Sequence, residues 1–383
     1  MAKYHTPGVA DSDHRSQQGA VRRVCLVAAD GGAGDLSGPR RHASVHYAMT
    51  SRTDIAAAAA RIAGHVRHTP VLRLAGAELG LALPLALKLE LLQHAGSFKP
   101  RGAFNRMLSA QASVAQVSAA QSAAEAPATK AQGTQMPTTG LPSAGVIAAS
   151  GGNHGAAVAY AARALGVTAE IFVPDLTPQA KVARIASYGA RVVQGGETYA
   201  EALAASRARQ AETGALEVHA YDHPAVLAGQ GTVGREFELD APDLTHVLVA
   251  TGGGGLIGGI AAWYAGSAAV VSVEPEGCPA LHDALRAGKP VAARVGGLAA
   301  DSLGARQVGA LMFPIAARYV TDAVLVPDDA IAAAQRLLWD RLRLIAEPGG
   351  ATALAALLCG AFVPPDGARV GVLVCASAKV AVS

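Results

Sequence analysis

The residue of this sequence that is best placed to take part in a reaction is Lys99, in a loop that spans residues 96–102. Pro100 follows it directly, and glycines stand at both ends of the loop. Because proline restricts the residue before it and suits the start of a helix, we expect the backbone of Lys99 to be fixed. A lysine with a depressed pKa can act as a nucleophile that forms a Schiff base. A lone Lys-Pro pair is more often a solvated turn, so this interpretation depends on the other motifs.

A first glycine-rich loop follows a predicted strand at residues 146–149 and opens a predicted helix. Its candidate ligand-binding residues are Ser150, Gly151, Gly152, Asn153 and His154. Small residues let the backbone approach a ligand, and a helix N-terminus favours an anion. The loop therefore predicts a site for a substrate carboxylate. The alternative is a plain glycine turn with an asparagine cap.

A second glycine-rich loop follows a predicted strand at residues 247–250. It consists of Gly252, Gly253, Gly254, Gly255 and Leu256. A run of glycine amides at a helix start is typical of a phosphate cradle. Gly253, Gly255 and Gly258 also have dinucleotide-loop spacing, and Glu274 stands about 20 residues on, where a ribose-binding acid is expected. NAD is therefore a competing interpretation, and tight helix packing without a ligand is a third.

Cys375 directly follows a predicted strand at residues 370–374. A thiol there could face the ring nitrogen of a cofactor, or it could simply be buried. Taken together, the lysine, the carboxylate loop and the phosphate loop describe a cofactor that has both a phosphate and an aldehyde. Pyridoxal phosphate fits this description, whereas NAD leaves Lys99 without a role.

The elements that must position these motifs alternate between strand and helix after residue 144. Their continuous apolar strands indicate a largely parallel sheet covered on both faces, which binds ligands at its carboxyl ends. We expect a large cofactor-binding domain from residues 51–108 and 226–383, and a small domain from residues 144–225. Residues 1–50 are predicted to be a disordered tail, and residues 109–143 a mobile low-complexity insertion.

Composition narrows the class of protein. The chain has 383 residues, of which 51% are hydrophobic and 16% charged, and this favours a globular enzyme of roughly two domains. A net charge of +3 gives no reason to expect nucleic acid or a membrane surface as a partner. The four cysteines lack the spacing of a disulfide framework or a zinc site. With neither a membrane-spanning run nor a secretory signal in the sequence, we expect a cytoplasmic protein.

The motifs at residues 97–103, 150–155 and 252–255 occur in an order that resembles the pyridoxal-phosphate-dependent threonine/serine dehydratase family, of fold type II and similar to tryptophan synthase beta. The resemblance runs from about residue 53 to residue 375, apart from the insertion. It implies two three-layer α/β/α domains with mostly parallel sheets and the cofactor in the cleft between them. It also implies β-elimination from L-threonine and/or L-serine, which gives a 2-oxo acid and ammonia, and a homodimer.

The resemblance further implies a role for each motif. Lys99 would hold the cofactor as a Schiff base and remove the Cα proton of the substrate, and Phe98 would pack beside the ring. Asn153 would hydrogen-bond the ring hydroxyl, and Cys375 would stand near the pyridine nitrogen. The first glycine-rich loop would bind the substrate carboxylate, and the second would bind the cofactor phosphate.

Three departures from the family bear on the implied activity. Gly151 stands where racemases of the family carry a serine base, which disfavours racemisation. Glu274 matches one acid of a divalent-cation site, but Ala280 replaces the other, so we predict no metal. The stretch at residues 375–379 lacks the glycine and asparagine that usually follow the serine or cysteine at the end of this strand. The alternatives to a dehydratase are therefore a pyridoxal-phosphate-binding protein with impaired activity and an NAD-dependent oxidoreductase.

Overall fold

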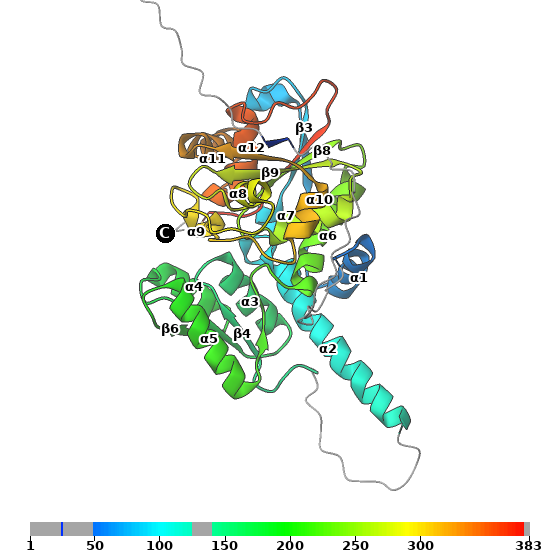
Figure 1. Cartoon of the computed structure of the whole chain (residues 1–383), viewed down its shortest axis with the longest axis vertical. Helices are drawn as coiled ribbons and strands as arrows, with labels where there is room; N and C mark the ends of the chain where they lie inside the picture. The colour runs from blue at the N-terminus through cyan, green and yellow to red at the C-terminus, as the bar shows by residue number, and fades with distance from the viewer. Residues whose placement is uncertain (1–23, 26–48, 125–139, 379–383) are drawn as a thin grey trace, which may run out of the picture.

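The computed structural model describes residues 24–25, 49–124 and 140–378, which form a large and a small α/β domain (Figure 1). The large domain is built on a seven-stranded sheet of order β1-β10-β9-β8-β11-β3-β2. Its strands are β1 Val24–Cys25, β2 Val71–Leu74, β3 Leu85–Lys88, β8 His246–Ala250, β9 Ala269–Pro275, β10 Val320–Val326 and β11 Val370–Leu373. Only the edge strands β1 and β2 pair antiparallel with their neighbours, which confirms the predicted mostly parallel sheet.

Helices cover both faces of the large sheet. On one side α6 and α7 pack together with α1 against them, and on the other side α12 packs on β8, β9 and β10 with α11 beside it (Figure 1). The helices are α1 Arg52–Ile62, α6 Pro224–Asp240, α7 Gly255–Tyr264, α8 Ala280–Ala287, α9 Ala300–Leu303, α10 Phe313–Tyr319, α11 Asp328–Leu342 and α12 Pro348–Leu358. Short 3-10 helices lie at Gly76–Leu79, Glu90–Leu92 and His94–Gly96. The domain therefore has the three α/β/α layers that the resemblance implies.

The small domain repeats this arrangement on a parallel sheet of order β6-β5-β4-β7. Its elements are β4 Val146–Ala149, α3 Asn153–Ala164, β5 Ala169–Val173, α4 Gln179–Ser187, β6 Arg191–Gln194, α5 Tyr199–Thr213 and β7 Leu216–Glu217. Successive side chains of β4 point to opposite faces. Val146 and Ala148 pack in the same cluster as α3, whereas Ile147 and Ala149 pack with Leu203 of α5.

The longest helix, α2 Lys99–Ala124, packs against α6 of the large domain and α3 of the small domain (Figure 1). The prediction of an unstructured insertion at residues 109–143 is wrong for residues 109–124, which continue this helix. The segment lacks bulky apolar residues, but alanine and glutamine favour helix, and two of its serines bond to backbone carbonyls of the preceding turn. Residues 125–139, the middle of the predicted insertion, lie outside the described residues.

Other elements follow the sequence closely, with a few exceptions. β4 has the predicted bounds, and β8 and β11 differ from their predicted ranges by one residue at one end, whereas β10, β7 and α10 are not predicted. Thr321 and Asp322 interrupt the apolar run of β10 and hide its strand character. Within the tail predicted to be disordered, Val24–Cys25 pairs with β10, and residues 1–23 and 26–48 lie outside the described residues. No described helix is long and apolar enough to cross a membrane.

Candidate active site

The predicted motifs converge because each follows the carboxyl end of a parallel strand. The first glycine-rich loop follows β4, the second follows β8, and Cys375 follows β11. The Lys99 loop is joined to the end of β11 by a bridge between Ser97 and Ala376, and the Phe98 amide donates to the Cys375 carbonyl at 3.2 Å. The structure therefore gathers residues separated by almost 280 positions into one site.

Lys99 is the first residue of α2, and its ammonium has a backbone acceptor instead of a carboxylate. Nζ donates to the carbonyl of Ala220 at 2.9 Å and lies 5.1 Å from the centroid of the Phe98 ring. The residue as a whole keeps some solvent exposure, but its amine is buried. Burial lowers the pKa of Lys99 to about 8, although Cys375 and Glu347 act in the opposite direction. An amine with this pKa is partly neutral near pH 7 and can act as a nucleophile or a base.

The first glycine-rich loop leads into α3 with its small residues packed tightly. A Cβ at Gly151 would lie 2.9 Å from a methyl carbon of Thr177, and the Gly152 amide donates to Ser150 Oγ at 3.2 Å. Asn153 Nδ2 donates to Glu347 Oε1 at 2.8 Å, which orients its side chain. Backbone amides at the start of α3 suit a carboxylate. The predicted carboxylate site therefore has suitable geometry.

His154 has a different environment from the rest of this loop. It is buried, and its Nε2 lies 2.7 Å from the carbonyl of Val218. Burial, followed by the charge of Lys99, lowers the pKa of His154 to about 3. The imidazole is therefore neutral and donates from Nε2 to the carbonyl, because a carbonyl can only accept. Its side chain braces the loop, and its backbone remains the part suited to bind a substrate.

The second glycine-rich loop forms a close-fitting backbone cradle before α7. A Cβ at Gly253 would lie 2.5 Å from the Tyr221 ring, and one at Gly254 would lie 2.4 Å from Met312 Cε. Gly254 also has a φ of +86°, a backbone conformation that residues with a side chain rarely adopt. The first four amides of a helix have no partner within it, and the N-cap residue of α7, Gly254, makes no side-chain hydrogen bond to them. These features fit a phosphate group, because its oxygens can accept hydrogen bonds from the amides at the start of α7.

Cys375 lies just after β11 and close enough to Lys99 to influence the pKa of its amine. Its buried Sγ donates to the Gly349 carbonyl at 3.4 Å. Burial, followed by the negative charge of Glu347, raises the pKa of Cys375, so the thiol is neutral. The unusual residues after it pair with the Lys99 loop, because the backbone amide and hydroxyl of Ser377 both donate to the Gly96 carbonyl.

Glu347 is a site residue to which the sequence analysis gives no role. It stands immediately before Pro348, the first residue of α12, and binds Asn153 from the opposite side of the cleft. Burial raises the pKa of Glu347, although the hydrogen bond from Asn153 opposes this. The Glu-Pro pair at a helix start is the signal in the sequence, but only the fold shows that it faces Asn153.

Glu274 cannot serve as the ribose-binding acid of the NAD alternative. It is completely buried at the end of β9, and its two oxygens accept the amides of Leu281 and His282, each at 2.7 Å. Burial raises the pKa of Glu274 to about 8 despite these hydrogen bonds. The carboxyl group therefore caps α8, which begins at Ala280, and does not face a ligand.

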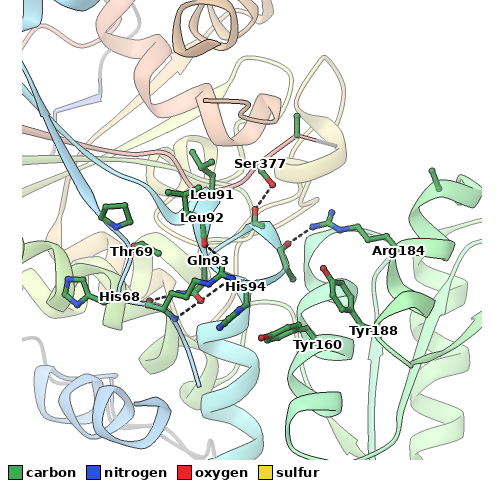
Figure 2. Close-up of a pocket in the computed structure, with 16 residues that line it drawn as sticks. His68, Thr69, Leu91, Leu92, Gln93, His94, Tyr160, Arg184, Tyr188 and Ser377 are labelled. Carbon is green, nitrogen blue, oxygen red and sulfur yellow. Dashed lines mark hydrogen bonds between the residues drawn. The ribbon is translucent and has the colours of Figure 1, made fainter. Parts of the chain in front are cut away.

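A separate cavity of about 1200 Å³ lies between the 91–96 segment and the helices of the small domain (Figure 2). Tyr160 of α3 and Arg184 and Tyr188 of α4 line one side of it, and Arg184 donates to the Ala95 carbonyl. None of the predicted site residues lines this cavity. It therefore adjoins the candidate active site, to which Gly96 and the hydrogen bond from Arg184 to Asn153 Oδ1 at 3.4 Å connect it.

A lysine with a lowered pKa and two glycine-rich loops, at the carboxyl ends of the strands of two α/β domains, is the arrangement expected of a pyridoxal-phosphate-type site. Consistent with this, residues 62–376 match the family model described as "Pyridoxal-phosphate dependent enzyme". The match extends over more than half of the sequence, so the chain belongs to this family. The predicted family and cofactor are therefore confirmed.

Individual similar proteins include ammonia-lyases and a dehydratase. The chain is 37% identical over 301 residues to an L-threonine ammonia-lyase of Geobacter sulfurreducens, covering 78% of this chain and 68% of the relative. It is 35% identical to a phenylserine dehydratase of Ralstonia pickettii, covering 84% and 91%. The match to an L-threonine ammonia-lyase of Thermotoga maritima, at 35% identity, spans 62% of that protein's length.

Solved structures of similar proteins confirm the fold. The maize serine racemase matches with a TM-score of 0.75 at 30% identity, covering 88% of this chain and 95% of that chain. A threonine deaminase from T.th. matches with a TM-score of 0.73 at 34% identity, covering 86% and 99%. Similar proteins therefore include both an eliminating enzyme and a racemase, and the site must distinguish them.

Proposed function

We propose that the chain catalyses the pyridoxal-phosphate-dependent dehydration and deamination of a β-hydroxy amino acid, L-threonine and/or L-serine, to a 2-oxo acid and ammonia. The observation that carries the proposal is Lys99, an amine with a pKa of about 8 that contacts no carboxylate of the described residues within ion-pair distance. The printed names of the ammonia-lyase and dehydratase relatives support the same reaction class.

The residues divide the work as follows. Pyridoxal phosphate, when bound, supplies an electron sink that makes the Cα proton of an amino acid acidic. The amides at the start of α7 would hold its phosphate, Phe98 would pack beside its ring, and the neutral Cys375 thiol would face its nitrogen. The loop at residues 150–154 would bind the substrate carboxylate. Lys99 would take the Cα proton, with the Ala220 carbonyl as the acceptor that orients its amine.

Gly151 favours elimination over racemisation. A racemase needs a second base on the face of Cα opposite the lysine, and a glycine offers no side-chain base. The space beside Gly151 is already occupied by Thr177, whose methyl carbon leaves no room for a larger residue without movement. The chain is 30% identical to a rice serine racemase, but for this chain we expect elimination and not racemisation.

The deciding experiment combines turnover with covalent labelling. The full-length protein loaded with pyridoxal phosphate is incubated with L-threonine, L-serine and phenylserine, and the 2-oxo acid released is measured. Borohydride reduction followed by peptide mass spectrometry should then find the cofactor on Lys99. An unmodified Lys99 peptide would contradict the proposal. Labelling without turnover would instead favour the impaired-activity alternative. The homodimer and the cytoplasmic location implied by the resemblance stay predictions.

A further inference from the structure

The short segment at residues 219–223 joins β7 of the small domain to α6 of the large domain, and it contacts two parts of the site. The carbonyl of Ala220 accepts a hydrogen bond from Lys99 Nζ at 2.9 Å. The side chain of Tyr221 packs against the second glycine-rich loop, so closely that a Cβ at Gly253 or Gly255 would overlap it. The conformation of this segment therefore sets the surroundings of both the reactive amine and the predicted phosphate cradle.

His219 determines the shape of this segment through a single ring nitrogen. Its Nδ1 accepts the backbone amides of Tyr221 at 3.2 Å and of Asp222 at 2.8 Å. A ring nitrogen that accepts hydrogen bonds carries no proton, so His219 is neutral and its proton is on Nε2. Its ring also packs edge-on against the Tyr221 ring, with the centroids 5.0 Å apart. The imidazole thus closes a turn in which Ala220 projects its carbonyl toward Lys99.

The far end of the segment is anchored independently. The carboxylate of Asp222 accepts the amides of Ala310 at 3.0 Å and Leu311 at 2.9 Å in the large domain. His223 Nδ1 accepts the Ala225 amide at 3.1 Å and caps the start of α6. Because these anchors do not involve His219, losing its acceptor nitrogen would loosen the Ala220 and Tyr221 positions while leaving the rest of the connection in place.

We propose that His219 is a positioning residue, whose neutral imidazole holds the Ala220 carbonyl on the Lys99 amine and the Tyr221 ring on the phosphate-binding loop. This inference rests on the proposed function, since it concerns the same site. Its consequence is that cofactor affinity and the chemical step both depend on an acceptor at Nδ1, although His219 itself is not required to touch the substrate.

The proposal has a definite pH dependence. Burial lowers the pKa of His219; Glu217 and Asp222 oppose this, and Lys99 and Arg207 reinforce it. The titratable and charged groups that face the ring are Lys99, His154, Arg207, Glu217, Tyr221, Asp222 and His223. As the pH falls, protonation of Nδ1 would replace an acceptor with a donor and break both amide contacts. Cofactor affinity should therefore fall at acid pH through this residue.

The first test compares His219→Asn with His219→Leu in the full-length protein. Asparagine places an oxygen acceptor at the position of Nδ1 and favours the same kind of turn, whereas leucine fills the space without an acceptor. Because H219L removes the acceptor of both amide hydrogen bonds, it should raise the dissociation constant of pyridoxal phosphate about tenfold and lower kcat by a similar factor. In H219N the dissociation constant and kcat should both stay within about threefold of wild type. Because asparagine does not titrate, the affinity of H219N for pyridoxal phosphate should fall less at acid pH than that of the wild type. Equal damage in H219N and H219L, or wild-type affinity and kcat in H219L, would overturn the inference.

A second measurement needs no disruptive variant. Long-range 1H–15N spectra of histidine-labelled wild-type protein, assigned by the signal that H219N loses, report which ring nitrogen is protonated. A proton on Nε2 alone at pH 7 is expected, and a proton on Nδ1 would contradict the proposal even if H219L fails to fold. Failure of the proposed function is a separate outcome, because the wild-type protein would then neither bind the cofactor at Lys99 nor release a 2-oxo acid.

Discussion

Lys99 and Arg101 stand two residues apart at the start of α2, yet they lie in opposite electrostatic environments. Arg101 donates to both oxygens of Glu90, at 2.6 and 2.8 Å, and to Glu236 at 2.9 Å. Lys99 donates to a backbone carbonyl. Burial opposes the charge of both residues, but the two carboxylates raise the pKa of Arg101 above its ordinary value, whereas that of Lys99 falls. One helix start thus carries a cation held for stability and a cation left available for chemistry.

The partners of Arg101 belong to a larger group, which we call the ionic cluster: Lys88, Glu90, Arg101, Glu236 and Asp240. Lys88 is fully buried but binds Glu236 at 2.8 Å, Asp240 at 2.9 Å and the Thr69 carbonyl at 2.7 Å. His68 also approaches Asp240, so His68, Glu236 and Asp240 together have the spacing of a metal site. Lys88 and Arg101 already bind the carboxylates, and the cluster is therefore structural.

The largest effect on turnover should come from Lys99→Met, which removes the amine that has no carboxylate partner. Turnover should fall by at least about 10³-fold, since nucleophile and proton acceptor are lost together. Because the ammonium is desolvated without a carboxylate partner, unfolding free energy should change by less than about 1 kcal/mol. The 2-oxo acid assay and chemical denaturation measure the two quantities.

A matched control for this prediction is Lys289→Met, which removes an exposed lysine beyond α8. This variant should keep wild-type turnover and stability. If K99M destabilised the protein as much as a broken buried ion pair does, the contrast between Lys99 and Arg101 would be wrong.

The sequence reveals much of this site because its motifs are local. Lys99, the two glycine-rich loops and Cys375 all stand at ends of apolar strands, and parallel strands bring such ends together. Glu347 and the 219–223 segment escape prediction because their roles depend on contacts between residues far apart in the chain. The helical continuation of α2 is missed for another reason: a low share of bulky apolar residues indicates weak burial, but alanine-rich sequence still favours helix.

The second largest effect should come from Arg101→Leu, which breaks the ionic cluster. Glu90 and Glu236 would remain in the interior without their main partner, and this costs about 3–5 kcal/mol. Turnover measured below the melting transition should fall less than in K99M. Arg336→Leu is the control, since it removes an exposed arginine of α11 and should cost less than about 0.5 kcal/mol. Thermal and denaturant unfolding measure the loss.

Acid unfolding provides a sharper version of the same test. Burial favours the neutral form of Glu236, but Arg101 and Lys88 outweigh it and lower its pKa to about 2. The stabilisation from this carboxylate is therefore present above its ordinary pKa and is lost as the pH falls toward 2. In R101L the folded-state pKa of Glu236 should rise toward its unfolded value, so R101L should lose less stability than wild type as the pH falls from its ordinary pKa toward 2. Identical acid unfolding curves for R101L and wild type would contradict this assignment.

An intermediate effect is expected for Glu347→Gln, which tests how the unpaired lysine is tuned. Glutamine keeps an oxygen acceptor for Asn153 but removes a negative charge that raises the pKa of Lys99. The pKa of Lys99 should therefore fall below its wild-type value, and turnover should decrease by about tenfold or less. The pH dependence of Lys99 labelling by an amine-reactive reagent, followed by mass spectrometry, measures the shift. Glu276→Gln, at an exposed position, is the charge-matched control and should leave the pKa of Lys99 unchanged. If the pKa of Lys99 shifted in E276Q and not in E347Q, the assignment would be wrong.

The smallest effect should come from Cys375→Ser. The thiol is neutral and donates weakly to the Gly349 carbonyl, and a serine hydroxyl can donate to the same oxygen. Turnover should therefore change by no more than about threefold. Cys375→Asp is the opposite case, because an ionised carboxylate would give Lys99 the kind of partner that Arg101 has and raise its pKa. C375D should thus require higher pH for turnover, and the two pH profiles compare directly. A C375S variant as inactive as K99M would mean that the thiol takes part in the chemistry. The presence or absence of carboxylate partners would then not be enough to explain why Lys99 and Arg101 differ.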